Sequence, residues 1–183
     1  MSQAVVTLMR ALDFAARKHR DQRRKGADKE PYINHLTEVA CLLAEATDGE
    51  DPISVVAGLL HDTVEDTGTK LEEIEREFGA DVAVLVAEVT DDKSLPKAER
   101  KRLQVENAPH KSDRAKMIKI ADKTSNLRSV VASPPVHWDS TRQREYFAWA
   151  ARVVAGCRGV NPKLEAHFDA AHRAGLRAIE ARG

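Results

Sequence analysis

Residues 59–67 read Leu59-Leu60-His61-Asp62-Thr63-Val64-Glu65-Asp66-Thr67, and an apolar segment, residues 53–60, runs directly into them. Side chains three and four residues apart are neighbours on a helix, so the spacing predicts that His61 faces Glu65 and that Asp62 faces Asp66. Burying four groups that can hold a metal or move a proton is costly, because polar groups lose their hydration. The stretch therefore predicts an enzyme's metal centre near the end of an apolar helix.

Helical spacing continues from this stretch toward both ends of the chain, and most of the expected helices have recognisable end residues. Asp51 followed by Pro52 is a capping residue and a proline at the first helical position. Thr69-Lys70-Leu71-Glu72 fits a capping box, and Gly79 ends the helix that it opens. The expected helices cover residues 2–19, 36–47, 52–62, 69–79, 81–90, 96–109, 112–131, 139–155 and 161 onward.

The pattern predicts an all-α fold, a compact helical bundle formed as a single domain by residues 1–183. A chain of 183 residues is long enough to bury a sizeable core. No apolar run approaches the ~20 residues that a membrane helix needs. The first residues, Met1-Ser2-Gln3-Ala4, lack the basic start and apolar core of a signal peptide. We therefore expect a cytoplasmic protein with no membrane partner.

Charge and cysteine content narrow the function further. Lysine plus arginine and aspartate plus glutamate number 29 each, so the net charge is zero and nothing favours nucleic acid globally. Aromatic residues make up only 4% of the chain, too few for a base-stacking single-strand binder. Cys41 and Cys157, the only cysteines, lie in apolar helical patterns and are predicted to be buried free thiols. The residues carry no indication of an oligomeric state.

Four residues are the metal candidates: His35, His61, Asp62 and Asp122. Two imidazoles and two carboxylates suit Mn, Fe, Zn or Mg without choosing among them. Such a site leaves positions open for water and a substrate oxygen, so that the metal can activate the water and polarise a phosphoryl group. Glu65 or Asp66 would then exchange the proton. The simpler interpretation is that each histidine is an ordinary core or surface residue and that Asp122 faces solvent.

The order of these residues, a histidine, a His-Asp pair and a later aspartate, resembles the HD-domain metal-dependent phosphohydrolases. Longer strings are similar to the hydrolase domain of RelA/SpoT-type proteins, which removes the 3′-pyrophosphate of (p)ppGpp. These strings are Arg24-Lys25-Gly26, Pro31-Tyr32-Ile33-Asn34-His35, residues 60–67, Phe78-Gly79, Glu88-Val89-Thr90, residues 119–123 and Asn126-Leu127. Residues 91–106 and 145–151 resemble the stand-alone form, the Mesh-type small alarmone hydrolases.

The resemblance implies a role for each matching residue. It implies that the four metal candidates hold Mn²⁺ and that Glu65 and Asp66 serve the attacking water. It also implies that a nucleotide is contacted by five residues, with Arg24 near the base, Lys25 near phosphate, Asn126 and Tyr146 near the ribose and phosphate, and Arg142 facing the same pocket.

Two positions depart from the family pattern. Leu36 stands where the family has proline after the metal histidine, and Thr124-Ser125 stand where it has an aromatic residue or histidine. We expect the second departure to reshape the nucleotide pocket.

Other basic and aromatic residues have simpler interpretations. Runs of charge are usually solvated faces, so the basic residues of one helix, Lys97, Arg100, Lys101 and Arg102, are expected to decorate its exposed surface. Tyr146 and Trp149 are spaced like a core stripe, and without the resemblance both would be interpreted as packing residues.

The leading hypothesis is a manganese-dependent enzyme that converts ppGpp to GDP and pyrophosphate. A second hypothesis keeps the site and changes the substrate to the 2′-phosphate of NADPH or another phosphorylated nucleotide. A third, from a different class, is a non-catalytic nucleotide sensor, against which the intact Glu65 and Asp66 argue. A nucleic-acid-binding role is disfavoured by the zero net charge. It would use the basic run formed by Arg17, Lys18, Arg20, Arg23, Arg24 and Lys25.

Overall fold

The computed structural model describes residues 3–182, and all regular elements in that range are helices. The helices are α1 Gln3–Lys18, α2 Ile33–Ala46, α3 Pro52–Leu60, α4 Thr63–Thr67, α5 Leu71–Phe78, α6 Ala80–Val89, α7 Lys97–Asn107, the short 3₁₀ helix Ala108–His110, α8 Asp113–Ala132, α9 Ser140–Ala155 and α10 Pro162–Glu180. The predicted all-α fold is confirmed. The extent of the single domain, residues 1–183, stays a prediction.

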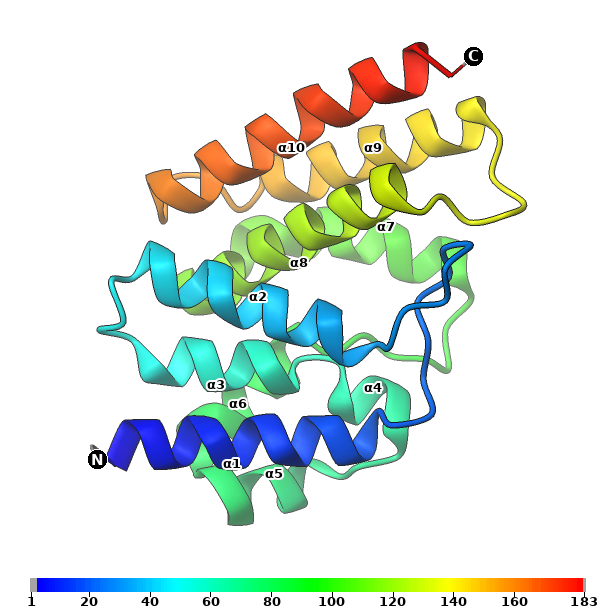
Figure 1. The fold of residues 1–183 in the computed structure, drawn as a ribbon. Coiled ribbons are helices and arrows are strands. Elements are labelled where there is room, and N and C mark those ends of the chain that lie inside the picture. Colours follow the sequence, from blue (N-terminus) through cyan, green and yellow to red (C-terminus); the bar gives the residue numbers. More distant parts are fainter. Residues whose placement is uncertain (1–2, 183) are drawn as a thin grey trace.

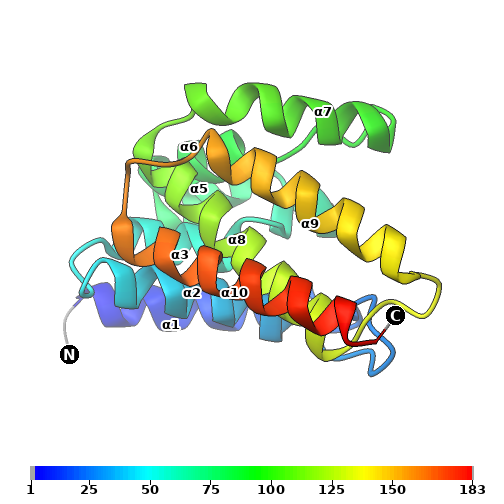
Figure 2. The same cartoon turned by 90° about the horizontal axis from the view of Figure 1, so that it is seen from above.

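Helix α8 runs through the middle of the bundle. It packs against α2 and α3 on one side and α9 and α10 on the other (Figure 1). Five polar or charged residues of α8 are nevertheless buried: Lys119, Asp122, Lys123, Thr124 and Ser125. Polar groups removed from water need partners, so this helix carries polar chemistry into the centre of the molecule. Helix α7 lies at an outer edge next to α9 (Figure 2).

Several predicted helix ends are confirmed. The Asp51 side chain accepts a hydrogen bond from the Ser54 backbone N–H at 3.3 Å, with Pro52 at the first helical position. Gly79 ends α5 at a φ of 92°, a backbone conformation that glycine adopts without strain. The predicted capping box is wrong, because Lys70 occupies the N-cap of α5 with no side-chain capping bond. Thr69 instead shares a 2.8 Å hydroxyl contact with Thr67.

The His61-Asp62 pair lies at the end of the apolar helix, as expected, although this helix ends two residues earlier than the expected range 52–62. Helix α3 ends at Leu60, the pair forms a turn, and α4 begins at Thr63. His61 and Asp62 therefore leave the helix at a break. The break changes the direction of the chain between the pair and the two later carboxylates, so these groups reach different parts of one site.

The cysteine prediction is half wrong. Cys157 is buried, in the turn after α9, but Cys41 is exposed on α2. The buried side of α2 is formed by its neighbours Val39 and Leu42. Cys41 lies on the polar side of the helix, where its thiol donates to Glu45 at 3.4 Å. Between residues 3 and 182, no helix combines the length and the apolar character needed to cross a bilayer.

Candidate active site

The four candidate metal ligands converge from three separate segments. His35 lies in the first turn of α2, His61 and Asp62 lie at the break between α3 and α4, and Asp122 lies in the middle of α8. The His61 Nε2 atom is 3.2 Å from Asp62 Oδ2 and 3.9 Å from Asp122 Oδ1. The His35 Nε2 atom is 3.7 Å and 3.4 Å from the same two oxygens. Ligand atoms that share one cation at bond lengths of about 2.0–2.2 Å lie roughly 3 Å apart. His35, His61 and Asp62 form a mutually close group of this kind, and Asp122 lies beside the group, within reach of both imidazole nitrogens.

Both histidines present the nitrogen that a cation needs. The Nδ1–H of His61 donates to the Gly58 carbonyl at 2.8 Å. The Nδ1 of His35 contacts Ser125 Oγ at 2.9 Å, and this hydroxyl donates to Glu38 at 2.6 Å, so the imidazole is the donor to Ser125. In the neutral form of each ring, Nε2 is therefore the nitrogen whose lone pair is available to a cation. In the part of the chain that the structure describes, both Nε2 atoms are buried without a hydrogen-bond partner.

The charges of the cluster also favour a cation. Burial by itself would lower the pKa of His61, yet the carboxylates of Asp62 and Asp122 raise this pKa to about 9. Burial by itself would raise the pKa of Asp122, but Lys123 and the two imidazoles hold that pKa well below its usual value. The residues thus fit a divalent cation, which would take the place of the proton on His61.

Hydrogen bonds hold the two carboxylate ligands in place. The Tyr32 hydroxyl donates to Asp62 Oδ2 at 2.5 Å, and Lys123 donates to Asp122 Oδ2 at 2.8 Å. The Asn126 amide donates to the other oxygen of Asp122. Partners of this kind orient metal ligands and tune their affinity.

Glu65 and Asp66, the candidate catalytic carboxylates, project from α4 beside the metal cluster. Glu65 accepts from the Asp91 backbone N–H at 3.3 Å, and burial together with the nearby Asp62 and Asp91 charges raises its pKa. Asp66 forms an ion pair with Lys93 and accepts a hydrogen bond from Gln22 at 2.7 Å. A carboxyl group with a raised pKa is suited to exchanging protons near neutral pH.

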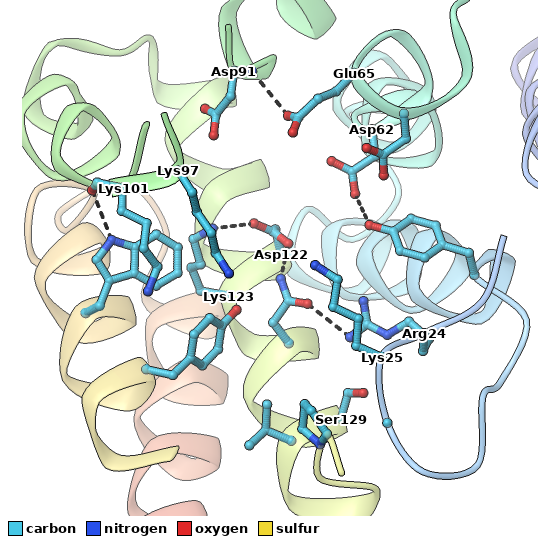
Figure 3. Close-up of a pocket in the computed structure, with 18 of the residues that line it drawn as sticks. Arg24, Lys25, Asp62, Glu65, Asp91, Lys97, Lys101, Asp122, Lys123 and Ser129 are labelled. Carbon is cyan, nitrogen blue, oxygen red and sulfur yellow. Dashed lines mark hydrogen bonds and ion pairs between the residues drawn. The ribbon is translucent and has the colours of Figure 1, made fainter. Parts of the chain in front are cut away.

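A cavity of about 540 Å³ opens over these carboxylates. All five residues expected to contact a nucleotide line it: Arg24, Lys25, Asn126, Arg142 and Tyr146. The Arg24 guanidinium donates to Asn126 at 3.0 Å and lies over the Tyr32 ring at 5.7 Å. Figure 3 shows Glu65 and Asp62 at one end of the cavity and Lys97 and Lys101 at another, with Asp122 between them.

The prediction that the basic residues of α7 form an exposed surface is wrong for Arg100 and Lys101, which are half-buried, whereas Lys97 and Arg102 are exposed. Lys97, Arg100 and Lys101 line the cavity, and only Arg102 points away, in ion pairs with Glu99 and Glu106. The three share their side of α7 with Gln104, at the i, i+3, i+4, i+7 spacing of one helix face. The sequence shows that these four residues share one helix face. It does not show that this face borders a cavity.

Lys101 has an unusual setting for a lysine. Its Nζ lies 4.2 Å from the centroid of the Trp149 ring and 5.3 Å from that of Tyr146. Burial and the neighbouring cations, Arg142 foremost among them, lower its pKa to about 8. Tyr146 and Trp149 line the cavity together with Tyr32 and Trp138, so neither is only a packing residue.

The two departures from the family pattern have different consequences. Leu36 is fully buried in the core and does not line the cavity. Thr124 bonds to the Ile120 carbonyl within α8 at 2.8 Å. Ser125 is the hydroxyl that receives the His35 Nδ1–H, so this departure acts on the metal centre more directly than on the nucleotide pocket.

Comparison with known proteins agrees with this geometry. Residues 11–152 match the family described as the HD domain, and the chain belongs to this family. Human guanosine-3′,5′-bis(diphosphate) 3′-pyrophosphohydrolase MESH1 is 54% identical over 165 residues, which are 90% of this chain and 92% of the human protein. The protein of the same name from Xenopus tropicalis is 52% identical over 169 residues, 92% of this chain and 94% of its own.

A solved structure gives the same result for the fold. It is described as a metazoan ortholog of SpoT that hydrolyzes ppGpp and plays a role in starvation responses. It matches with a TM-score of 0.88 and 48% sequence identity, covering 93% of this chain and 96% of the other. The resemblance inferred from the sequence motifs is therefore confirmed.

Proposed function

We propose that this protein is a metal-dependent 3′-pyrophosphohydrolase that converts ppGpp and water to GDP and pyrophosphate, with Mn²⁺ as its ion. The single observation that carries the proposal is the polarity of the cavity. Five carboxylates line the cavity, those of Asp62, Glu65, Asp66, Asp91 and Asp122, and the buried Nε2 atoms of His35 and His61 lie behind two of them. Lysines and arginines, among them Lys97, Lys101 and Arg142, line the opposite wall. The similarity to enzymes named for this reaction supports the choice of substrate.

His35, His61, Asp62 and Asp122 would hold the ion. When bound, it would supply Lewis-acid activation of water and of a phosphoryl oxygen. A nitrogen and oxygen ligand set is compatible with Mn²⁺, and the absence of cysteine from the cluster disfavours ions that prefer sulfur.

Glu65 and Asp66 are the proton-exchanging groups of the proposed reaction. The water oxygen forms a bond to the phosphorus atom that is attached to the ribose 3′-oxygen. The bond between this phosphorus and the ribose 3′-oxygen breaks. One carboxylate takes the proton that the water loses, and the 3′-oxygen leaves with a proton. Glu65 is suited to hold a proton because its pKa is raised by burial and by Asp62 and Asp91.

The cationic wall would bind the phosphate groups of the substrate. Lys97 and Lys101 have no carboxylate partner among the ion pairs of the described residues, and burial followed by neighbouring cations lowers the pKa of each. Uncompensated cations beside an acidic centre favour an anionic ligand. The Arg24 guanidinium, which lines the cavity and lies over the Tyr32 ring, would stack on the base.

A panel assay tests the proposal and separates its competitors. Purified protein with Mn²⁺ is incubated with ppGpp, NADPH and common nucleotides, while pyrophosphate and phosphate release are measured separately. We expect pyrophosphate from ppGpp. Faster release of phosphate from NADPH would show that NADPH is the substrate instead of ppGpp. Binding without any turnover would identify a sensor.

The cytoplasmic location expected from the sequence stays a prediction.

A further inference from the structure

His19 is a buried histidine that the proposed reaction does not use. It follows the end of α1, its residue is only 2% exposed, and it does not line the cavity. Its Nδ1 lies 2.5 Å from Gln22 Oε1, and its Nε2 lies 3.3 Å from Thr63 Oγ1 on α4. Its ring stacks on Tyr32 with a centroid distance of 5.3 Å and an interplanar angle of 17°.

The neighbouring carboxylate determines which way these hydrogen bonds run. Gln22 places its amide nitrogen 2.7 Å from Asp66 Oδ2, and an ionised carboxylate can only accept. The Gln22 amide therefore presents its oxygen to His19, and Nδ1 of His19 must carry the proton. The Nε2 atom is then the acceptor for the Thr63 hydroxyl. Burial lowers the pKa of His19, in agreement with a neutral ring of this tautomer.

The two oxygens of Asp66 are held in different ways. Oδ1 is paired with Lys93, whose side chain is 47% exposed on the segment between α6 and α7. Oδ2 is held by Gln22, which is itself held by the buried His19. An exposed lysine loses side-chain entropy when it is fixed in an ion pair, whereas a packed imidazole is already ordered. The Gln22 bond therefore has the firmer support.

We infer that His19 and Gln22 are positioning residues that hold Asp66 toward the cavity, through a relay from the imidazole Nδ1–H to the Gln22 amide to Asp66 Oδ2. This inference rests on the proposed role of Asp66 in proton exchange. The relay gives a part in the site to His19 and Gln22, which belong to none of the sequence motifs. It also explains why an imidazole outside the cavity is buried with both of its nitrogens bonded.

A double-mutant cycle tests the relay. Gln22→Met removes the donor and keeps the length of the side chain. We expect it to lower kcat on the order of 10- to 100-fold with little change in KM, because a misplaced catalytic group slows the chemical step. In an Asp66→Asn background the same change should alter kcat by no more than about twofold, because there is no carboxylate left to hold. Equal losses in the two backgrounds would overturn the inference.

Rescue separates positioning from folding. His19→Leu should lower kcat as Gln22→Met does, whereas His19→Asn, which can keep an N–H donor near the place of Nδ1, should recover most of the loss. If His19 were purely structural, its substitution would lower the melting temperature, and His19→Leu and His19→Asn would have about the same kcat. Gln143→Met is the matched control, because Gln143 is a buried glutamine that bonds to the Trp138 carbonyl and to no carboxylate.

Two features of the test distinguish a failure of the relay from a failure of the proposed function. The cycle is run on whichever substrate of the panel is turned over, so a wrong substrate overturns the proposed function and leaves the relay testable. Nitrogen NMR of the imidazoles requires no turnover. It should show His19 as the neutral Nδ1–H tautomer, and an Nε2–H tautomer would overturn the relay.

Discussion

The two ends of the cavity are built on opposite principles. The metal end is buried and its atoms are held individually: His61 by a backbone carbonyl, His35 by Ser125, and Asp62 by Tyr32. The cationic wall on α7 and α9 is partly exposed. Lys101 rests on the Trp149 ring, and neither Lys97 nor Lys101 has a carboxylate partner among the ion pairs of the described residues. One end is organised before any ligand arrives, and the other keeps charge free for a ligand to neutralise.

This difference separates chemistry from recognition. Proton exchange and metal binding demand atoms fixed within fractions of an ångström, and a dense set of hydrogen bonds provides that accuracy. Phosphate binding tolerates a longer and more flexible contact, because the attraction between charges falls off slowly with distance. Substitutions at the metal end should therefore abolish turnover, and those on the cationic wall should weaken it by degrees.

Removal of the metal should have the largest effect. A strong chelator, or Asp122→Ala, is expected to abolish hydrolysis and to lower the melting temperature, because one ion joins three separate segments. An ion at 100 times its dissociation constant stabilises the native state by about 2.7 kcal/mol. Calorimetry with metal content measured in parallel checks both effects, and an unchanged melting temperature and activity after verified metal removal would contradict the metal centre.

Substitution of the candidate catalytic carboxylates should come next. Glu65→Gln and Asp66→Asn keep the size of the side chain and remove its capacity to exchange a proton. We expect turnover to fall by roughly 10²- to 10⁴-fold while metal content stays unchanged. Wild-type turnover in both single variants would show that these carboxylates have another role.

The cationic wall should show a smaller loss, concentrated in KM. Lys101→Met keeps the aliphatic contact with Trp149 and removes the charge, and loss of a contact to a charged group is expected to raise KM by about tenfold. Arg102→Met on the same helix is the matched control, since its guanidinium pairs only with Glu99 and Glu106. A larger effect at Arg102 would place the phosphate groups outside the cavity.

The smallest expected effect is a pH dependence that comes from the same lysine. Burial and nearby cations lower the pKa of Lys101 to about 8, so the cation is lost as the pH rises through that value. The ratio kcat/KM reports groups of the free enzyme, and it should therefore fall between about pH 7 and 9. The fall in kcat/KM should be shallower in Lys101→Met. If the wild type and Lys101→Met show the same fall above pH 7, another group is responsible for it.

Much of the fold could be predicted from local patterns. The caps at Asp51 and Gly79 and the apolar spacing of most helices depend on neighbours a few residues away, and the structure has them where they were expected. The capping box at Thr69 was wrong, and the helix expected over 52–62 ends at Leu60. The Thr69 hydroxyl contacts that of Thr67 instead of capping α5, and His61 and Asp62 form the turn between α3 and α4.

The sequence by itself determined the all-α fold, the HD family and the acidic and imidazole groups at the metal end, because the motif residues are close together or occur in a recognisable order. Only the tertiary structure decided that Ser125 fixes His35, that His19 lies behind Asp66, and that Lys101 faces the cavity. These are contacts between segments far apart in the chain. A charged helix face has the same sequence pattern whether it borders water or a ligand cavity, and the difference arises only from the packing of α7 against α9.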